Sequence, residues 1–587
     1  YATRTENGRA TQRRLFAEDA AQGFAFIDLA RINFDLLLMN PPFGEARETI
    51  APMLTSYYPV WSRNLLCAFI ARAQEWLLPN AYLGAIFDKT ALIKSSYAEF
   101  RETQIYTSPG AFLLVDLGWG VLDDASVEIA LGVFSGNPRS YVDLLRYRDL
   151  PLDEREELIA NSVQAISVGI RTHHCAVFRR EVLRRFPNGA VPFDVDDWLV
   201  DVIGRCQTFE EIVGRALAGH SLKADINFRL FWEIPLHSRI GIGEYWSTLY
   251  NGSDFSLYAT PLRDVTRYGV DGDAVPPHIS TRWCNRAAQQ RPGIAWGKRG
   301  DFVDAHVMPE GTVFTVEGQG LPLDSYRWLA LGLINSRIFW FLMNLFCGQH
   351  KYAGYVNVCP VPPIDSDICS VVEGFVESAV EIVRADFQYD ETTREFIHPR
   401  FAFVFGSLKE QAEKIAQAAK ERASDLEALD LAINSGIEQW YGLDSEGAIT
   451  VRHATRGAPT SRESLCRWES TEGAAVSVAM DVVSYAVGCV VGRWDIRFVI
   501  EPNLAPKRND PFAALPSWPP GLLVGPDGQP ARPNGIASQE WLRARSAEAD
   551  AAVQASGDSR TTIRDSDYPL RIDWDGILVD DPEHADD

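Results

Sequence analysis

Two patterns of apolar and polar positions recur along the first 140 residues. Short continuous apolar runs, such as FDLLLM, are typical of strands buried on both faces of a sheet. Between them lie segments with apolar residues three and four positions apart, which predicts helices. The order is strand, helix, strand, helix and then two strands joined as a closing hairpin, over residues 34–39, 64–78, 81–87, 91–102, 111–117 and 127–134. This order predicts an α/β fold and half of a doubly wound sheet.

Beyond residue 140 the pattern changes several times. A mixed, largely helical connector is followed by short strand-like pieces rich in Trp, Tyr, Gly and Arg, and then by segments whose apolar spacing predicts a packed helical bundle. A Pro- and Gly-rich linker and the start of a further domain come last, with nine Asp or Glu against two Arg over residues 561–587. We therefore expect divisions at 1–145, 146–224, 225–365, 366–500 and 501–587.

Composition limits the classes of protein that fit. A chain of 587 residues, 46% of them hydrophobic, can build several cores. No run of about eighteen apolar residues is present, and the nine cysteines form no CxxC pair, which predicts reduced thiols in a cytoplasm. His173-His174-Cys175 has no matching second half, so we predict no metal site. The net charge of −23 excludes a nucleic-acid binder that uses its whole surface but leaves room for a local basic groove.

The first apolar run ends abruptly at Asn40-Pro41-Pro42-Phe43. Two prolines remove two backbone donors and fix two φ angles, so no regular element continues past Asn40. The result is a rigid corner that presents an amide, two carbonyls and an aromatic ring at the carboxyl end of a strand. In doubly wound sheets ligands bind at such ends. The alternative is an ordinary turn that ends a strand.

This stretch resembles the amino-methyltransferases in which Asn/Asp-Pro-Pro-Tyr/Phe holds a target adenine. The resemblance implies the Rossmann-like fold of class I methyltransferases, S-adenosylmethionine as cofactor, and catalytic roles for Asn40, Pro41, Pro42 and Phe43. Asn40 and the Pro41 carbonyl would accept hydrogen bonds from the N6 amine, and Phe43 would stack on the flipped base.

The same resemblance implies a cofactor contact upstream. Asp19, in LFAEDA, stands where the third strand of such a domain ends, and would contact the adenine amine of the cofactor. The glycine-rich cofactor loop of the family is not in this chain. We therefore expect the chain to begin inside the methyltransferase domain, without its first two strands, and not to bind the cofactor alone. Asp116 to Gly120 resembles that loop in a circularly permuted enzyme, but VLDDASVEIALGVFSG after it predicts a turn and a strand instead of a helix.

Residues 225–365 combine basic and aromatic side chains. Seven basic residues fall within forty positions, interleaved with aromatic residues, as suits a surface that follows phosphates and reads base edges. The candidates for contact with double-stranded DNA are Arg282, Arg286, Arg291, Lys298 and Arg299. The alternative is a solvated β-domain whose arginines are paired. The segment ends in residues 329–364, which are similar to the junction that closes target-recognition domains of type I and type IIG methylases, with a helix at Asn335-Ser336 and a return to the spacer at Pro360 to Pro363.

These features together predict a site-specific adenine-N6 DNA methyltransferase of a restriction-modification or phage-defence system, working with other subunits. Residues 116–128, 487–497 and 568–584 are similar to the large methyltransferases of BREX-type phage defence. No arrangement of acids and Lys typical of a metal nuclease is visible, so cleavage is not predicted. The open alternatives are a non-catalytic DNA-recognition or assembly subunit, and a methyltransferase that acts on RNA or protein.

Overall fold

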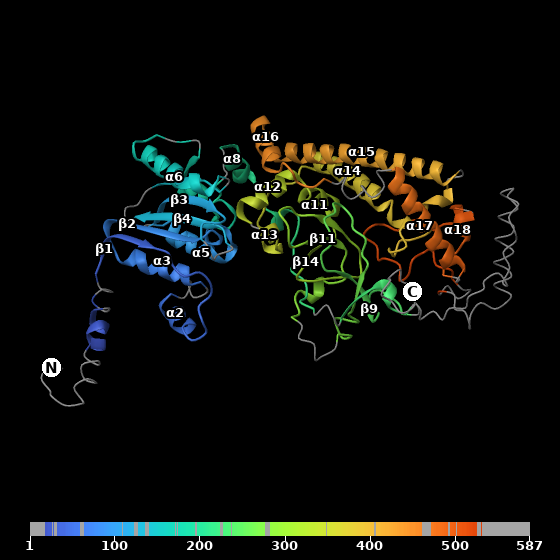
Figure 1. Cartoon of the computed structure of the whole chain (residues 1–587), viewed down its shortest axis with the longest axis horizontal. Helices are drawn as coiled ribbons and strands as arrows, with labels where there is room; N and C mark the ends of the chain where they lie inside the picture. The colour runs from blue at the N-terminus through green and yellow to red at the C-terminus, as the bar shows by residue number, and fades with distance from the viewer. Residues whose placement is uncertain are drawn as a thin grey trace, which may run out of the picture. The chain divides into compact units, whose positions relative to one another are not determined.

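In the computed structural model the chain divides into two compact units, residues 1–204 and residues 205–587, which are described separately (Figure 1). The structure describes residues 18–25, 28, 32–58, 64–107, 110–122, 127–135, 140–148, 150–170, 172, 174–193, 197–222, 227–235, 238–275, 282–347, 349–403, 407–460, 471–490, 493–500, 502–524 and 530. The predicted acidic tail and the start of a further domain lie outside these residues. The predicted divisions at 145, 224, 365 and 500 stay predictions.

The first unit contains a six-stranded mixed sheet with the strand order β1-β2-β4-β3-β5-β6. β1 is parallel to β2, β2 and β3 are both antiparallel to β4, and β3 is parallel to β5. The strands are β1 (Phe34–Met39), β2 (Leu77–Asp88), β3 (Gly110–Gly118), β4 (Ile129–Ser135), β5 (Tyr141–Arg146) and β6 (Cys175–Arg179). The predicted hairpin is confirmed by the pairing of β3 with β4, and β5 and β6 extend the sheet beyond the strands that the pattern predicted.

Helices lie on both faces of this sheet, with α3 and α6 on opposite faces (Figure 1). The helices are α2 (Ala51–Tyr57), α3 (Leu65–Glu75), α4 (Thr90–Ile93), α5 (Ala98–Phe100), α6 (Leu152–Ser167), α7 (Arg180–Leu183) and α8 (Asp197–Arg205). α3 begins at Asn64, whose side chain accepts from the Leu66 amide, and ends before Pro79. The single helix predicted over 91–102 is instead broken into short pieces, because Lys94 has extended backbone geometry between α4 and the next turn.

β1 differs from the prediction of a strand buried on both faces. It is the edge strand of the sheet, and Leu36 and Leu38 are 59% and 76% exposed. The sequence pattern identified the strand, but burial depends on which elements cover it, and the described residues place none over these two leucines.

The second unit contains two small sheets, in the strand orders β13-β9-β10-β8 and β12-β11-β14, and a short pair, β15-β7. The strands are β7 (Gln207–Thr208), β8 (Phe228–Leu230), β9 (Trp246–Tyr250), β10 (Asp264–Arg267), β11 (Gly293–Gly297), β12 (Ala305–Met308), β13 (Thr312–Phe314), β14 (Gly318–Pro322) and β15 (Pro360–Val361). The strand-like piece at 255–261 forms only an isolated bridge between Tyr258 and His306.

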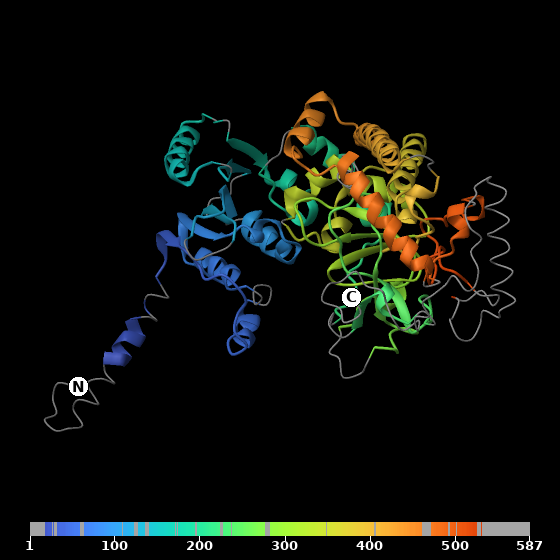
Figure 2. The same ribbon diagram turned by 45° about the vertical axis from the view of Figure 1, so that its right-hand side comes forward.

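Helices lie where the apolar spacing predicted them, and α14 packs along α15, a helix of 34 residues (Figures 1 and 2); the bundle as a domain over 366–500 stays a prediction. α15 begins with a capping box between Ser407 and Glu410 and ends at Gly442, where φ is +64°. The helices are α9 (Phe209–Ile212), α11 (Arg327–Ile334), α12 (Arg337–Phe346), α13 (Ala353–Asn357), α14 (Ser366–Arg384), α15 (Leu408–Tyr441), α16 (Ser445–Ala454), α17 (Thr471–Val490) and α18 (Arg497–Ile500). Within the described ranges, no single helix has the length and apolarity to cross a membrane; α11 and α12 meet that test only jointly, and they are bent by 65°.

Candidate active site and nucleic-acid interface

The Asn40 corner lies at the edge of the sheet where four strands end. Because β2 and β3 are both antiparallel to β4, and β1 and β5 are parallel to β2 and β3 respectively, β1, β2, β3 and β5 all run in one direction. Met39, the last residue of β1, is in register with Ala85 of β2. The structure therefore brings Asn40 to the edge at which β2, β3 and β5 also end.

The corner keeps its polar groups available. Asn40 is exposed, Pro41 is buried, and Phe43 is half-buried against the apolar cluster of β3, β4 and β5. Among the described residues the Asn40 side chain has no hydrogen-bond partner. Gly44, at φ +103°, accepts a hydrogen bond from the Leu65 amide at 3.0 Å, which ties the end of the corner to the start of α3. The corner is thus fixed by its backbone, while the Asn40 amide has no partner in the part of the chain that the structure describes.

The start of α3 is fixed in turn by a second contact. The Asn64 amide nitrogen lies 2.5 Å from the hydroxyl of Tyr97, to which it donates. Burial raises the pKa of Tyr97, so its hydroxyl stays neutral. This contact, which the sequence pattern did not indicate, holds the helix that receives the corner.

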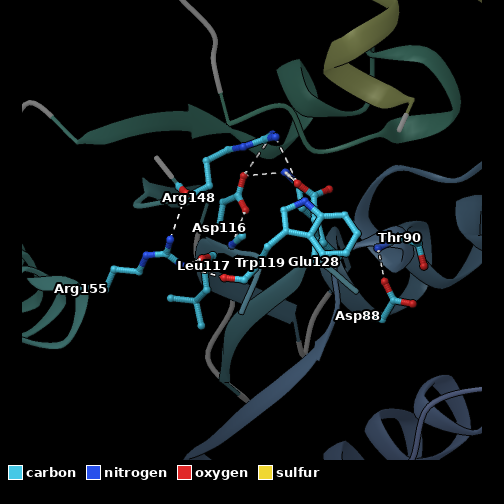
Figure 3. A network of polar contacts seen from close by, with 10 residues as sticks. Asp88, Thr90, Asp116, Leu117, Trp119, Glu128, Arg148 and Arg155 are labelled. Atoms are coloured by element: carbon cyan, nitrogen blue, oxygen red, sulfur yellow. Dashed lines mark hydrogen bonds and ion pairs between the residues drawn. The ribbon is translucent and has the colours of Figure 1, made fainter. Parts of the chain in front are cut away.

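Beside the corner, two cations and two anions form a network (Figure 3). The Lys89 ammonium lies 2.6 Å from the Asp116 carboxylate, and both side chains are buried. Arg148 lies 3.1 Å from Glu128 and 3.9 Å from Asp116. The four residues come from the ends of β2, β3 and β5 and the start of β4, so the network joins the strands at this edge. None of them was predicted as a site residue.

Trp119 follows directly after β3 and is 51% exposed at the same edge. Its backbone carbonyl accepts a hydrogen bond of 3.2 Å from Arg155 of α6. A half-exposed indole offers a flat apolar face on which a planar ligand can stack. The only signal in the sequence was the pair of glycines around this residue, in GWG.

The described residues do not fit the methionine end of S-adenosylmethionine. Gly118 and Gly120 open no helix in the described part of the chain, and the Gly118 amide already donates to Asp116 at 3.2 Å. Within the described residues, this segment thus lacks the helix that a cofactor loop would open. Asp19 lies in a helical, exposed stretch, residues 18–25, instead of at a strand end, because the Ala-, Glu- and Gln-rich sequence there favours helix. Its contact with the cofactor stays a prediction.

The basic residues predicted to contact DNA divide into two groups in the second unit. Arg291 makes a two-pronged contact with Asp324 at 2.8 and 3.0 Å, Lys298 lies 2.6 Å from Glu317 and is buried, and Arg299 lies 3.5 Å from Glu317. Arg282 and Arg286 are exposed, and among the described residues no carboxylate pairs with either. The alternative of paired arginines thus holds for three residues of the five.

Arg286 belongs to an aromatic cluster. Its guanidinium lies 4.3 Å from the centre of the Trp283 ring, and Trp283 packs edge-on against His220. Burial lowers the pKa of His220 to about 4, and Arg286 adds to this effect, so the imidazole is neutral at pH 7. Arg286, and not the neutral His220, therefore supplies the positive charge in contact with the Trp283 ring.

No protein-family model matches the chain, and no curated protein matches it in sequence. Among solved structures, the Type IIL restriction-modification enzyme MmeI in complex with DNA is similar at a TM-score of 0.43 and 10% identity, over 75% of this chain and 57% of that one. The ATP-dependent Type ISP restriction-modification enzyme LlaBIII bound to DNA gives 0.36 and 10%, over 65% and 31%. A putative class I S-adenosylmethionine-dependent methyltransferase from Listeria monocytogenes gives 0.20 and 13%, over 23% and 42%. The chain spans less than two thirds of each of these proteins, and similarities of this extent do not assign a function.

Proposed function

We propose that the chain carries the base-binding corner and the DNA-reading surface of an S-adenosylmethionine-dependent DNA methyltransferase that modifies adenine at N6. The observation that carries the proposal is the Asn40-Pro41-Pro42-Phe43 corner, held at the carboxyl edge of the sheet with the Asn40 amide unpaired among the described residues.

The chemistry of the corner suits an aromatic amine. The lone pair of such an amine is delocalised into the ring, which makes it a poor nucleophile. Two acceptors, the Asn40 amide oxygen and the Pro41 carbonyl, would bind its two hydrogens and orient the lone pair towards the methyl donor. A base can reach the corner only after it leaves the duplex, at a cost of a few kcal/mol. Phe43 and Trp119 lie at this edge, and they would stack on the base and offset part of that cost.

Replacing Asn40 tests the proposal. In the complete protein, Asn40→Ala should leave most binding to duplex DNA intact but abolish methyl transfer, because removing an oriented polar contact at a reacting centre raises the barrier by about 3 to 4 kcal/mol, or several hundredfold in rate. Asn161→Ala, an exposed position on α6, is the matched control and should keep its activity. An Asn40→Ala protein that methylates at the wild-type rate would refute the adenine corner.

The finer parts of the proposal are adenine N6 as the acceptor and membership of a restriction-modification or BREX-type phage-defence system. They are tested by sequencing genomic DNA with detection of modified bases in cells that carry or lack the gene. N6-methyladenine at one short sequence supports them. DNA binding without any mark would favour a recognition subunit, and a mark on RNA or protein would change the substrate.

A further inference from the structure

Arg155 holds the polypeptide on both sides of the end of β3. It lies in the first turns of α6, it is 9% exposed, and all its observed contacts are with backbone carbonyls. It donates to Leu117 and Trp119 on one segment and to Arg148 and Leu150 on the other. One guanidinium thus connects the Trp119 turn to the turn after β5 (Figure 3).

Asp116 fixes the same turn through both of its carboxylate oxygens. Asp116 accepts from the Gly118 amide with one carboxylate oxygen and pairs with Lys89 through the other. Gly118 has a φ of +69°, and a Cβ there would lie 2.8 Å from the Cβ of Arg148. Only glycine therefore allows the close approach of the two segments that Arg155 connects.

Burying a guanidinium is costly unless it is hydrogen-bonded, and Arg155 offsets that cost through its four bonds to backbone carbonyls. These contacts hold the backbone of Trp119 rigid, while the Trp119 side chain is half-exposed. Rigid mounting of an aromatic ring removes the entropy that would be lost when a ligand orders it.

We propose that Arg155 is a positioning residue, which holds the Trp119 ring at the place where the extruded base stacks. The inference rests on the proposed function and deepens it. In that function Asn40 binds the amine of the base, whereas Arg155 affects the stacking of the base only by holding Trp119. Arg155 itself touches neither base nor cofactor.

Amide hydrogen exchange tests whether Arg155 holds the Trp119 turn, and it requires no methylation reaction. In Arg155→Met the amides of residues 117–122 should exchange at least tenfold faster than in the wild type, and Arg155→Lys should lie between them, because lysine keeps the charge but not the fork. Arg184→Met is the control, since Arg184 also donates to a carbonyl, that of Tyr106, but lies away from this edge. Unchanged exchange in Arg155→Met would overturn the inference.

Methylation kinetics of the complete protein test whether the position of the Trp119 ring matters for the reaction. Trp119→Ala, an exposed position that leaves the fold intact, and Arg155→Met should each lower kcat about tenfold or more with KM for DNA little changed, and the double variant should be no worse than the single ones. With 2-aminopurine at the target position, both variants should show a larger unstacked, long-lifetime fraction than the wild type.

The outcomes separate the two proposals. Full kcat in Trp119→Ala, or additive losses in the double variant, would overturn the positioning role while leaving the Asn40 corner intact. A complete wild-type protein that binds S-adenosylmethionine but methylates no nucleic acid would refute the proposed function, and the exchange data would then decide alone whether Arg155 holds the turn. If Arg155→Met does not fold, Arg155→Lys and Trp119→Ala carry the same comparison.

Discussion

The guanidinium of Arg286 lies 4.3 Å above the ring of Trp283, and among the described residues no carboxylate neutralises it. Its neighbour Arg282 is exposed and equally without an acidic partner in that part of the chain. The chain has a net charge of −23. Arg282 and Arg286, which have no acidic partner among the described residues and lie beside the Trp283 ring, are therefore the side chains that would contribute most to binding a phosphate backbone.

Replacing Arg282 and Arg286 together by Gln should weaken binding to duplex DNA and lower the salt dependence of the binding constant by about two units, one for each phosphate contact. The measurement is a titration of DNA at several salt concentrations. Arg291→Gln with Arg299→Gln removes the same two charges, but from side chains already paired with Asp324 and Glu317, and should change the slope less. The reverse order would place the DNA contact on the second pair.

The ion pair of Lys89 and Asp116 makes a prediction about stability. Lys89→Met leaves the Asp116 carboxylate, which is 1% exposed, with the longer contact to Arg148, at 3.9 Å, as its remaining ion pair among the described residues, so the free energy of unfolding should fall by about 3 to 5 kcal/mol. Adding Asp116→Asn should recover part of the loss. Glu75→Gln breaks the exposed pair with Arg72 and should cost at most about 1 kcal/mol. Chemical denaturation measures all of these, and equal losses for Lys89→Met and Glu75→Gln would contradict the prediction.

The sequence predicted the elements that depend on local chemistry. The prolines at 41 and 42 end β1, the glycines of GWG lie where β3 turns towards β4 in a hairpin, and residues 408–441, with their helical apolar spacing, form a long helix. These features are confirmed because backbone geometry and the spacing of apolar residues depend on residues that are close in the sequence.

What the sequence did not predict depends on contacts between distant segments. Arg155 and Leu117 are 38 positions apart, and Lys89 and Asp116 are 27 apart, so no spacing pattern joins them. The basic residues of 282–299 looked equivalent in the sequence, and only their partners, such as Glu317, distinguish them. The helix at Asp19 differs from expectation for the opposite reason, since the expected strand end came from the resemblance and the local residues favour helix; the cofactor contact itself stays a prediction.

Asp304 predicts a pH dependence of stability in the second unit. Burial raises the pKa of this carboxyl to about 8, whereas an unfolded aspartate titrates near 4. Between these values the folded protein holds a proton that the unfolded chain has released, so stability is full below about pH 4 and is lost as pH rises towards 8. Thermal unfolding followed from pH 5.5 to 8.5 should show the midpoint falling.

Asp304→Asn provides the test of that cause. The amide retains an oxygen for the Ser256 amide, 3.4 Å away, but cannot ionise, so the fall of the midpoint with pH should become shallower. Asp254→Asn removes the same charge from an exposed position and should leave the slope unchanged. An unaltered slope in Asp304→Asn would assign the pH dependence to other groups.

The outer edge of β1 predicts self-association. Leu36 and Leu38 are exposed on an edge strand whose outer side has no strand partner among the described residues, and such edges pair with other chains. Leu38→Lys should reduce association, because a charged group disfavours pairing while its aliphatic stem can still cover Gly84, where Leu38 now packs. Sedimentation and light scattering over a range of protein concentrations measure the effect. Leu431→Lys, at a leucine 65% exposed on α15, introduces the same charge on a helix and should not reduce association. If Leu431→Lys solubilised the protein as well as Leu38→Lys, the added charge and not the strand edge would be the cause.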